Sequence, residues 1–278
     1  MKINKSYNNS HPVLYLIATP IGNLGEFSPR ALETIKEMDI VAAEDTRNSC
    51  DLLKKFNISK KFVSLREHNE AEMSQMVINE ILSGKKVAYM SDAGYPAISD
   101  PGAILVKKAI ENDIAVSVIS GSSAFLNALV SSSLSTDHFY FHGFLSSKEV
   151  DAKKELNEIK SKNETLIFYE SPHRISNTIK IMFEILGDRK VSLQRELTKL
   201  NEEKIYGTLK ELSEMDLDSL KGEMVIIVEG NTSTEDVSDA EIIKRVNSLI
   251  NKGLTKKDAI EAISELDSIK KNHIKDLF

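Results

Sequence analysis

Three clusters of charged and hydroxyl-bearing side chains each follow a short apolar run, and their residue types suit proton transfer and anion binding. The clusters are Glu44-Asp45-Thr46-Arg47, Glu170-Ser-Pro-His-Arg174 and Arg195-Glu-Leu-Thr-Lys199. A carboxylate can act as a general base, whereas a guanidinium binds phosphate or carboxylate through two parallel hydrogen bonds. Helix capping by Asp45 or Thr46, together with internal ion pairs, would explain the same residues without any catalytic role.

The stretch from Val87 to Gly102 has the composition of a ligand-binding loop. Val87 to Met90 is a short apolar run typical of a buried strand, and small, turn-forming residues follow it. Asp100-Pro101 then predicts an N-cap and the first position of a helix that continues to Asn112. In an open α/β sheet such a loop lies at the carboxyl end of a strand, where ligands bind.

Two further turns contain glycine and hydroxyl residues. In Thr19 to Gly25, Gly22 and Gly25 allow close approach of the backbone to a ligand, but the spacing is neither a dinucleotide fingerprint nor a phosphate loop. Ser120-Gly-Ser-Ser-Ala124 begins a helix, so its N–H groups could hold an anionic or hydroxyl-bearing ligand. Plain capping of that helix is an equal alternative.

These segments must be positioned by strands that alternate with helices in the first half of the chain. The apolar runs predict strands at residues 13–19, 40–43, 61–65, 87–90 and 115–119. The helices between them are predicted at residues 28–37, 45–56, 71–82, 101–112 and 124–130. This alternation is typical of a parallel α/β sheet, and we expect an N-terminal α/β domain over residues 12–135.

The second half has more closely spaced strands, which predict an α+β domain with a mixed sheet over residues 136–230. Its strands are predicted at 138–145, 165–169, 191–193, 204–208 and 224–228, with a polar helical segment at 146–162. Glu170-Ser-Pro-His-Arg174 repeats the order of strand, cap, proline and helix.

A polar linker at 231–238 leads to three predicted helices of helix-turn-helix type over residues 239–278. Thr255 is the expected N-cap of the second helix. Six lysines would give this extension a cationic face: Lys252, Lys256, Lys257, Lys270, Lys271 and Lys275. Acidic residues are interspersed among them, so an ordinary solvated helical surface is the alternative.

The composition describes a soluble globular protein of about two domains. Apolar residues make up 41% of the 278 residues and charged residues 28%, with a net charge of −6. That charge excludes a protein coated in positive charge, so nucleic acid would contact a local patch. We expect no signal peptide and no membrane span. Cys50 is the single cysteine, which excludes an internal disulfide and indicates the reducing cytoplasm. No convincing set of metal ligands is present.

Five segments in fixed order carry a resemblance to a known family. They are Leu16–Leu24, Ala43–Arg47, Ser91–Gly102, Phe168–Arg174 and Arg195–Lys199. Together they closely resemble the small-subunit ribosomal RNA methyltransferase I family, within the tetrapyrrole-methylase class (class III) of S-adenosylmethionine enzymes. The resemblance covers essentially the whole chain. It implies a two-domain fold with a helix-turn-helix-like extension. It also implies a cytoplasmic homodimer that methylates the ribose 2′-hydroxyl of a cytidine in the decoding region of 16S rRNA.

The resemblance also implies where S-adenosylmethionine binds, in the cleft between the two domains. The residues carried over by matching segment are Pro20, Gly22, Asp92, Ala93, Gly94, Ile98, Ser122, Ser123, Ala124, Gly143, Phe144, Leu197 and Met224. Leu197 and Met224 would cover the adenine. One departure is visible at Ile119 to Ala124, where the wider class often has prolines around the glycine. The loop is therefore expected to be less rigid, and this bears on Ser122 and Ser123.

For the chemistry, Asp45 or Glu170 is the hypothetical base that withdraws the hydroxyl proton. The residues expected to bind the RNA backbone are Arg47, Arg174, Arg195, Lys199, Lys256 and Lys257. No metal is required. Two rival functions are a tetrapyrrole (precorrin-like) methyltransferase and a non-catalytic protein that binds nucleic acid through residues 239–278.

Overall fold

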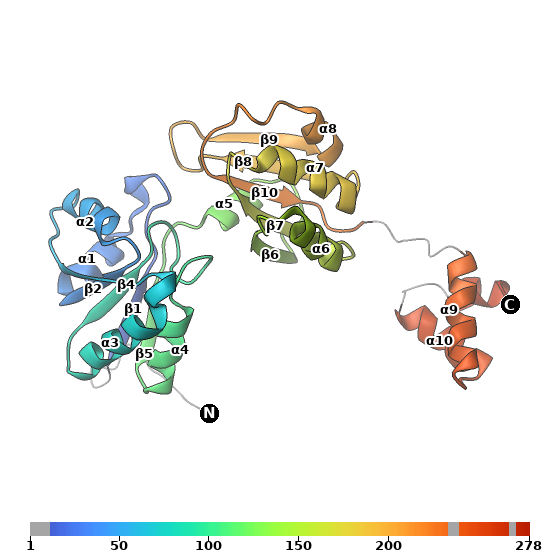
Figure 1. Ribbon diagram of the computed structural model, residues 1–278, viewed down its shortest axis with the longest axis horizontal. Helices are drawn as coiled ribbons and strands as arrows, with labels where there is room; N and C mark the ends of the chain where they lie inside the picture. The colour runs from blue at the N-terminus through green and yellow to red at the C-terminus, as the bar shows by residue number, and fades with distance from the viewer. Residues whose placement is uncertain (1–11, 233–238, 267–270) are drawn as a thin grey trace. The chain divides into compact units, whose positions relative to one another are not determined.

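The computed structural model describes residues 12–232, 239–266 and 271–278, and the chain divides at Gly230 into two compact units (Figure 1). The first unit contains two five-stranded sheets, and the second is a small group of helices. None of the helices within these residues is long and apolar enough to cross a bilayer.

The first sheet is wholly parallel, as predicted from the alternation of strands and helices. Its strands are β1 (Val13–Ile17), β2 (Ile40–Ala43), β3 (Lys61–Ser64), β4 (Val87–Met90) and β5 (Ala115–Ile119), in the order β3-β2-β4-β1-β5. Every residue of β2 and β4 is buried, because helices cover both faces of the sheet. This explains why their sequences are unbroken apolar runs rather than alternating ones.

Successive residues of these strands pack on opposite sides. On one face Leu16 and Tyr89 pack against α3 (Glu70–Leu82) and α4 (Ala103–Glu111). On the other face Ile17 and Met90 pack against α1 (Pro29–Glu37) and α2 (Thr46–Lys54). The carboxyl ends of β1, β2 and β4 are thereby fixed at one edge, where the predicted loops begin.

The second sheet is mixed, which confirms the prediction for this half of the chain. It comprises β6 (Phe139–Phe144), β7 (Thr165–Glu170), β8 (Lys190–Arg195), β9 (Glu203–Thr208) and β10 (Met224–Val228), in the order β6-β7-β10-β8-β9. Only β6 and β7 run parallel to one another, and the other neighbours are antiparallel. As a result β10, far along the chain, lies between β7 and β8.

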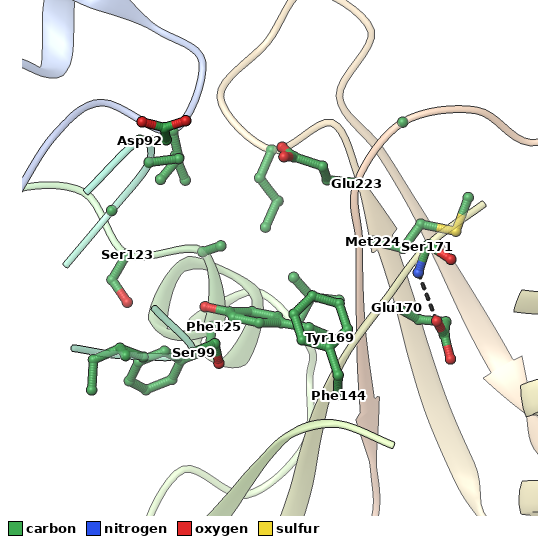
Figure 2. Close-up of a pocket in the computed structure, with 18 of the residues that line it drawn as sticks. Asp92, Ser99, Ser123, Phe125, Phe144, Tyr169, Glu170, Ser171, Glu223 and Met224 are labelled. Carbon is green, nitrogen blue, oxygen red and sulfur yellow. Dashed lines mark hydrogen bonds between the residues drawn. The ribbon is translucent and has the colours of Figure 1, made fainter. Parts of the chain in front are cut away.

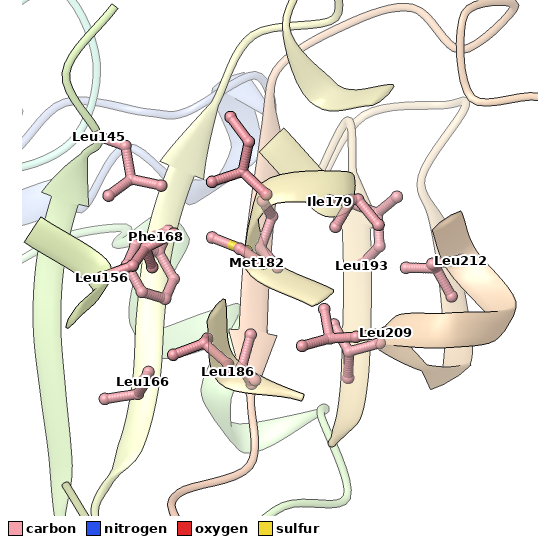
Figure 3. Close-up of a cluster of buried hydrophobic side chains, with 14 of the residues drawn as sticks. Leu145, Leu156, Leu166, Phe168, Ile179, Met182, Leu186, Leu193, Leu209 and Leu212 are labelled. Atoms are coloured by element: carbon pink, nitrogen blue, oxygen red, sulfur yellow. The ribbon is translucent and has the colours of Figure 1, made fainter. Parts of the chain in front are cut away.

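Helices cover one face of this sheet and form its main core (Figure 3). Phe168 and Leu193 of the sheet pack there against α6 (Glu149–Ile159), α7 (Ile175–Leu186) and α8 (Leu209–Glu214). The opposite face packs against α5 (Ala124–Val130), where Ala128 and Leu129 contact the buried strand residues. Gln194 holds α5 in place, since its side-chain amide donates to the Ala128 carbonyl at 2.9 Å.

Two predicted helix starts are wrong. Helix α4 was expected from Pro101 with Asp100 as its cap, but it begins at Ala103 with Gly102 as N-cap at φ 134°. The buried Glu70 carboxylate supplies the cap instead, accepting from the N–H groups of Gly102 and Ile104. Helix α7 begins at Ile175 rather than at Pro172, because a turn closed by the Arg174 N–H and the Ser171 carbonyl precedes it.

The second unit consists of α9 (Asp239–Asn251), α10 (Lys256–Leu266) and α11 (Lys271–Asp276). Its own apolar core includes Ile242, Val246 and Ile260. The Thr255 hydroxyl accepts from the Asp258 N–H at 3.2 Å, so Thr255 caps α10 as predicted. Most of the predicted linker, residues 233–238, lies outside the described residues, and so does residue 268, at which the sequence predicts the start of the last helix.

Candidate functional site

A cavity of about 760 Å³ lies between the two sheets of the first unit. Its walls come from the ends of β2, β4 and β7 and from the loops after β1, β5 and β8. Loops at the carboxyl ends of parallel strands form one side, as expected for an α/β sheet. The second sheet supplies the other side through β6, β7 and β10 and the loop after β8.

The loop after β4 is held in a specific shape. The Tyr89 hydroxyl donates to the Pro101 carbonyl at 2.8 Å, and Glu70 accepts from the Gly102 N–H at 2.8 Å. Within the loop, Ala97 and Ser99 have φ values of 67° and 60°, which residues other than glycine rarely adopt. Such strain persists only where surrounding contacts fix the backbone, and it is frequent at functional sites.

The loop after β8 forms the opposite rim and is also strained. Glu196 and Thr198 have φ values of 52° and 67°. The Lys199 ammonium donates to Glu196 at 2.9 Å and to Glu223 at 3.0 Å. The stem of Lys199 lies against Gly22, where a Cβ would collide with it. Lys199 therefore joins the loops of the two sheets, and this contact requires glycine at position 22.

The cavity is strongly acidic. Six carboxylates line it: Glu44, Asp92, Asp100, Glu170, Glu196 and Glu223. Lys199 is the one lysine or arginine among the described lining residues. Close like charges favour protonation or attract a cation, so the cavity suits a ligand with a positive centre.

An aromatic wall completes the cavity. Figure 2 shows Phe125, Tyr169 and Phe144 beside one another, with the rings of Phe144 and Tyr169 5.5 Å apart. Burial raises the pKa of Tyr169 to about 12, so its hydroxyl stays protonated and can donate. Flat apolar surfaces of this kind pack against a planar heterocycle.

Asp45 lies outside this cavity. Its carboxylate accepts from the Arg47 N–H at 2.9 Å and pairs with the Arg47 guanidinium at 2.9 Å. These hydrogen bonds hold the pKa of Asp45 well below its usual range. The residue is the N-cap of α2, and its own N–H donates to Asp92 at 3.3 Å. Asp92 in turn accepts from the Asn48 amide at 2.7 Å.

Glu170 lines the cavity, but its carboxylate is already engaged. It accepts from the Ser171 N–H at 2.8 Å (dashed in Figure 2) and from the Thr178 hydroxyl at 2.6 Å. Arg174 forms an ion pair with it at 3.3 Å, while the Arg174 guanidinium also donates to the Leu145 carbonyl at 2.8 Å. Arg174 thus connects the ends of β6, β7 and α7.

The other predicted RNA-binding residues differ in how free they are. The Arg47 side chain is 83% exposed, although it pairs with Asp45. Arg195 pairs with Glu203 at 2.6 Å, and Lys199 is held by its two glutamates. In the second unit the Lys256 ammonium donates to the Phe278 carbonyl at 3.0 Å, whereas Lys257 is exposed.

The structure brings most of the predicted donor-binding residues to one cavity. Those that line it are Asp92, Ala93, Gly94, Ile98, Ser123, Ala124, Phe144, Leu197 and Met224. Pro20 and Gly22 line a smaller adjoining cavity that shares Asp92. Ser122 and Gly143 line neither: the Ser122 hydroxyl donates to Glu26 at 2.6 Å, and Gly143 lies beside the Ser99 hydroxyl.

Several lining residues were not among the sequence predictions, notably Glu44, Asp100, Phe125 and Tyr169. Glu44, Asp100 and Tyr169 belong to segments that carry the family resemblance, so their position was the available signal. Phe125 lies in an apolar run and could not be distinguished from a core residue. Among the described residues, no group of three or more His, Cys, Asp or Glu could hold a metal ion.

Comparison with known structures places the fold. A uroporphyrin-III C-methyltransferase from Thermus thermophilus matches with a TM-score of 0.55 and 16% identity, covering 78% of this chain and 94% of that one. A cobalt precorrin-4 methyltransferase matches at 0.59 and 18%, covering 80% and 96%. Diphthine synthase matches at 0.61 and 17%, covering 79% and 90%. The predicted fold class is confirmed.

Curated relatives match over nearly the whole chain. The ribosomal RNA small subunit methyltransferase I of Halalkalibacterium halodurans is 42% identical, covering 100% of this chain and 99% of that protein. The proteins of that name from Bacillus subtilis and Vibrio cholerae are each 40% identical, covering 96% and 98% of this chain and 94% and 96% of theirs.

The family model for tetrapyrrole (corrin/porphyrin) methylases matches residues 13–213, and enzymes of this kind use S-adenosylmethionine as methyl donor. The cavity fits that donor, because its carboxylates suit a sulfonium and an ammonium and its aromatic wall suits an adenine. The chain belongs to the tetrapyrrole methylase family and, within it, to the ribosomal RNA small subunit methyltransferase I family of S-adenosylmethionine-dependent enzymes.

Proposed function

We propose that this protein methylates the ribose 2′-hydroxyl of a cytidine in the decoding region of 16S rRNA, acting in the cytoplasm as a homodimer. The observation that supports RNA as the substrate is how much of the chain matches the rRNA methyltransferases. The match covers 94–99% of the length of these rRNA methyltransferase relatives, and it includes the helical second unit of this chain. The tetrapyrrole methylase model stops at residue 213. A tetrapyrrole methyltransferase would leave residues 231–278 without a role.

In this proposal the cavity between the sheets holds the methyl donor. S-adenosylmethionine supplies, when bound, a methyl group on a positively charged sulfur that an attacking oxygen can displace. The loop after β4, fixed by Tyr89 and Glu70, would present its backbone to the donor. Leu197 and Met224 would cover the adenine from the second sheet. Holding the two reactants in line supplies much of the rate enhancement in such a displacement.

The attacking hydroxyl must lose its proton. A positioned general base typically raises the rate of such a step by ~10²–10⁴-fold. Asp45 and Glu170 are the bases predicted from the sequence, and each is paired with an arginine. The hydrogen bonds from Arg47 lower the pKa of Asp45, which favours the ionised form that a proton acceptor requires but opposes the uptake of a proton.

RNA would be bound by basic residues outside the cavity. Arg47, beside the cavity rim, and Lys257 of the second unit are the exposed members of the predicted set. The other predicted residues would bind RNA phosphates only through N–H groups that their present hydrogen bonds leave available. They are Arg174, Arg195, Lys199 and Lys256.

Mapping a transferred label tests the proposal. The purified protein is incubated with S-adenosylmethionine labelled in the methyl group and with small ribosomal subunits, or with stripped rRNA, from cells lacking this enzyme. We expect label in one alkali-resistant dinucleotide, because a 2′-O-methyl group blocks hydrolysis of the next phosphodiester. Donor binding with label on a tetrapyrrole but on neither RNA would favour the small-molecule function. Sedimentation analysis of the same protein tests the homodimer.

A further inference from the structure

Two arginines from neighbouring loops of the first sheet converge on one carboxylate. The Arg47 guanidinium binds Asp45 as a fork, because its Nε donates to one carboxylate oxygen at 3.2 Å and its Nη2 donates to the other at 2.9 Å. The Arg66 Nη2 lies 3.9 Å from the second of these oxygens. The Arg66 Nε donates to the Glu44 carbonyl at 3.2 Å. Two guanidinium groups therefore share the single negative charge of Asp45, and we call Arg47 and Arg66 the arginine pair.

The order of strands in the first sheet brings the two arginines together. β2 and β3 are parallel neighbours in which Ala43 pairs with Ser64, so the loops that follow these strands begin side by side. The Leu65 N–H donates to the Ala43 carbonyl at 2.8 Å and continues this pairing into the loop. The backbone of Arg66 is fixed in turn, since its N–H donates to the Asn69 side chain at 2.7 Å. Arg66 is therefore placed by its backbone as well as by its ion pair.

The arginine pair is open to solvent beside the cavity between the two sheets. The side chains of Arg47 and Arg66 are 83% and 44% exposed. Among the described residues, neither Nη1 has a hydrogen-bond acceptor. Glu44, which lines the cavity, directly precedes Asp45, and the Asp45 N–H donates to the lining residue Asp92 at 3.3 Å. The pair can therefore bind an anion at the rim of the cavity through N–H groups that the protein leaves available.

A cationic group at this rim would offset the charge of the cavity. The six carboxylates that line the cavity suit the positive sulfur of the donor, but they repel the phosphates on either side of a ribose. A ribose hydroxyl can therefore reach the methyl group only if a flanking phosphodiester is held at the rim against this repulsion. Guanidinium groups suit that task, because they bind phosphate through parallel N–H donors in a geometry that an ammonium does not reproduce.

We propose that Arg47 and Arg66 together bind one phosphodiester of the substrate RNA, next to the nucleotide that is methylated, and that Asp45 is the positioning residue that holds them. This inference rests on the proposed function. Asp45 separates two like charges and orients the Arg47 guanidinium, so the pair needs little reorganisation when the phosphate binds. In this role Asp45 acts through the arginines and not on the proton of the ribose hydroxyl.

The first test is the salt dependence of binding to rRNA stripped from small subunits, measured for Arg47→Gln, Arg66→Gln and the double variant. Each single variant should bind roughly 10-fold more weakly, which is the effect of losing a hydrogen bond to a charged group. In the double variant the slope of log affinity against log salt concentration should fall by roughly 0.7–0.9, the contribution of one phosphate. A fall of roughly 1.4–1.8 would mean that each arginine binds its own phosphate, and would overturn the shared site.

The matched control is the double variant Lys61→Gln and Lys107→Gln, which makes the same change in net charge. Lys61 begins β3, at the opposite end of the strand from Arg66, and Lys107 is exposed on α4. This control should bind the rRNA nearly as tightly as wild type. An equal loss of affinity in the control would show an effect of overall charge and would overturn the inference. Calorimetric binding of the donor shows that each variant is folded.

The second test is Asp45→Asn, for which the positioning role and simple electrostatics predict opposite results. Asparagine still caps α2 by accepting from the Arg47 N–H, so the start of the helix is kept. The variant has one negative charge fewer, yet we expect it to bind rRNA roughly 2–5-fold more weakly, because the two guanidinium groups are no longer held together. The control is Asp51→Asn, which removes the charge of an exposed aspartate of α2 that pairs with Lys54. It should bind at least as tightly as wild type.

Binding by Asp45→Asn that is as tight as binding by Asp51→Asn would remove the positioning role. Unchanged rRNA affinity with a loss of methyl-transfer rate would also overturn it, because Asp45 would then act as the base predicted from the sequence. Arg47→Lys gives a check that leaves Asp45 in place. Lysine keeps the charge but not the fork, so this variant should bind rRNA more weakly than wild type. Equal binding would mean that charge alone matters at this position, and would contradict the shared phosphate site.

The outcomes separate the two proposals. If the wild-type protein labels no ribose hydroxyl of small-subunit RNA, the proposed function fails and the role of the arginine pair fails with it. If wild type labels the RNA, and the double variant of Arg47 and Arg66 binds it as tightly as the lysine control does, the proposed function stands and only the inference fails.

Discussion

Glu170 is a buried carboxylate whose three partners all lie within the eight residues that follow it. It is 3% exposed, and it accepts from Ser171 and Thr178 and pairs with Arg174. Replacing Glu170 by glutamine removes the charge and places an amide N–H₂ against one of these donors. We expect the free energy of unfolding to fall by about 1–3 kcal/mol, measured by urea denaturation at pH 7.

Glu158→Gln is the matched control, because Glu158 is exposed on α6. It should change stability by less than about 0.5 kcal/mol. If Glu170→Gln were as stable as wild type but transferred no methyl group, Glu170 would be catalytic rather than structural, as the sequence-based hypothesis for this residue predicts.

For individual residues, the sequence predicted the segments that form the site better than the role of each residue within them. Glu44 and Asp100 lie in segments identified from the sequence, whereas the sequence predicts Asp45 and Glu170 as bases because each follows a strand and lies near an arginine. That arginine turns out to occupy the carboxylate in both cases. Whether a carboxylate is free depends on its burial and on the conformation of neighbouring side chains, neither of which residue spacing shows.

Among the elements, α3 fixes the loop after β4, which lines the cavity. Glu70 at its start accepts from Gly102 at 2.8 Å and from Ile104 at 2.9 Å, which are more than 30 residues away in the chain. Glu70→Ala leaves the buried Gly102 N–H and the partly buried Ile104 N–H without that partner. We expect it to lower the free energy of unfolding by about 1–3 kcal/mol and to weaken donor binding. Hydrogen exchange of residues 97–106 should speed up.

Glu72→Ala serves as the control for this prediction, since Glu72 lies in the same first turn of α3 but is exposed. It should leave loop exchange and donor affinity unchanged. Unchanged exchange in Glu70→Ala would mean that Tyr89 alone holds the loop.

The element boundaries illustrate what local sequence can determine. The helix that follows Ser28-Pro29 begins where predicted, because serine capping and proline at the first position act locally. Asp100-Pro101 has the same pattern but does not begin a helix, because Tyr89 holds the Pro101 carbonyl and Glu70 caps the chain two residues later. Contacts from elsewhere in the fold decided the second case.

For the molecule as a whole, the parallel first sheet could be predicted, whereas the strand order of the second could not. Alternating strands and helices permit few arrangements, which is why the first half follows the pattern. In the second half, β10 lies between β7 and β8 by antiparallel pairing. Its uniformly apolar sequence indicates a central strand but not its neighbours. The acidic cavity arises only from this assembly, because its carboxylates come from both halves of the chain.

RNA binding by the second unit can be tested separately from donor binding. A groove on its surface is lined by Lys256, Lys257, Lys271 and Lys275, from α10 and α11. Lys271 pairs with Glu261, and Lys256 donates to the Phe278 carbonyl. Among the described residues, Lys257 and Lys275 form no ion pair, so their ammonium groups are available for phosphates.

Replacing Lys257 and Lys275 by glutamine should therefore weaken binding to small-subunit rRNA without affecting donor binding. For each phosphate that the variant no longer neutralises, the slope of log affinity against log salt concentration should fall by roughly 0.7–0.9, because fewer counterions are released on binding. The control is the pair Lys36→Gln and Lys107→Gln, exposed lysines of α1 and α4 that give the same change in net charge. If both pairs lower the slope equally, the effect comes from overall charge and the groove has no specific role. If only the first pair does so, phosphates bind in the groove itself, which is a role that a tetrapyrrole methyltransferase would leave unfilled.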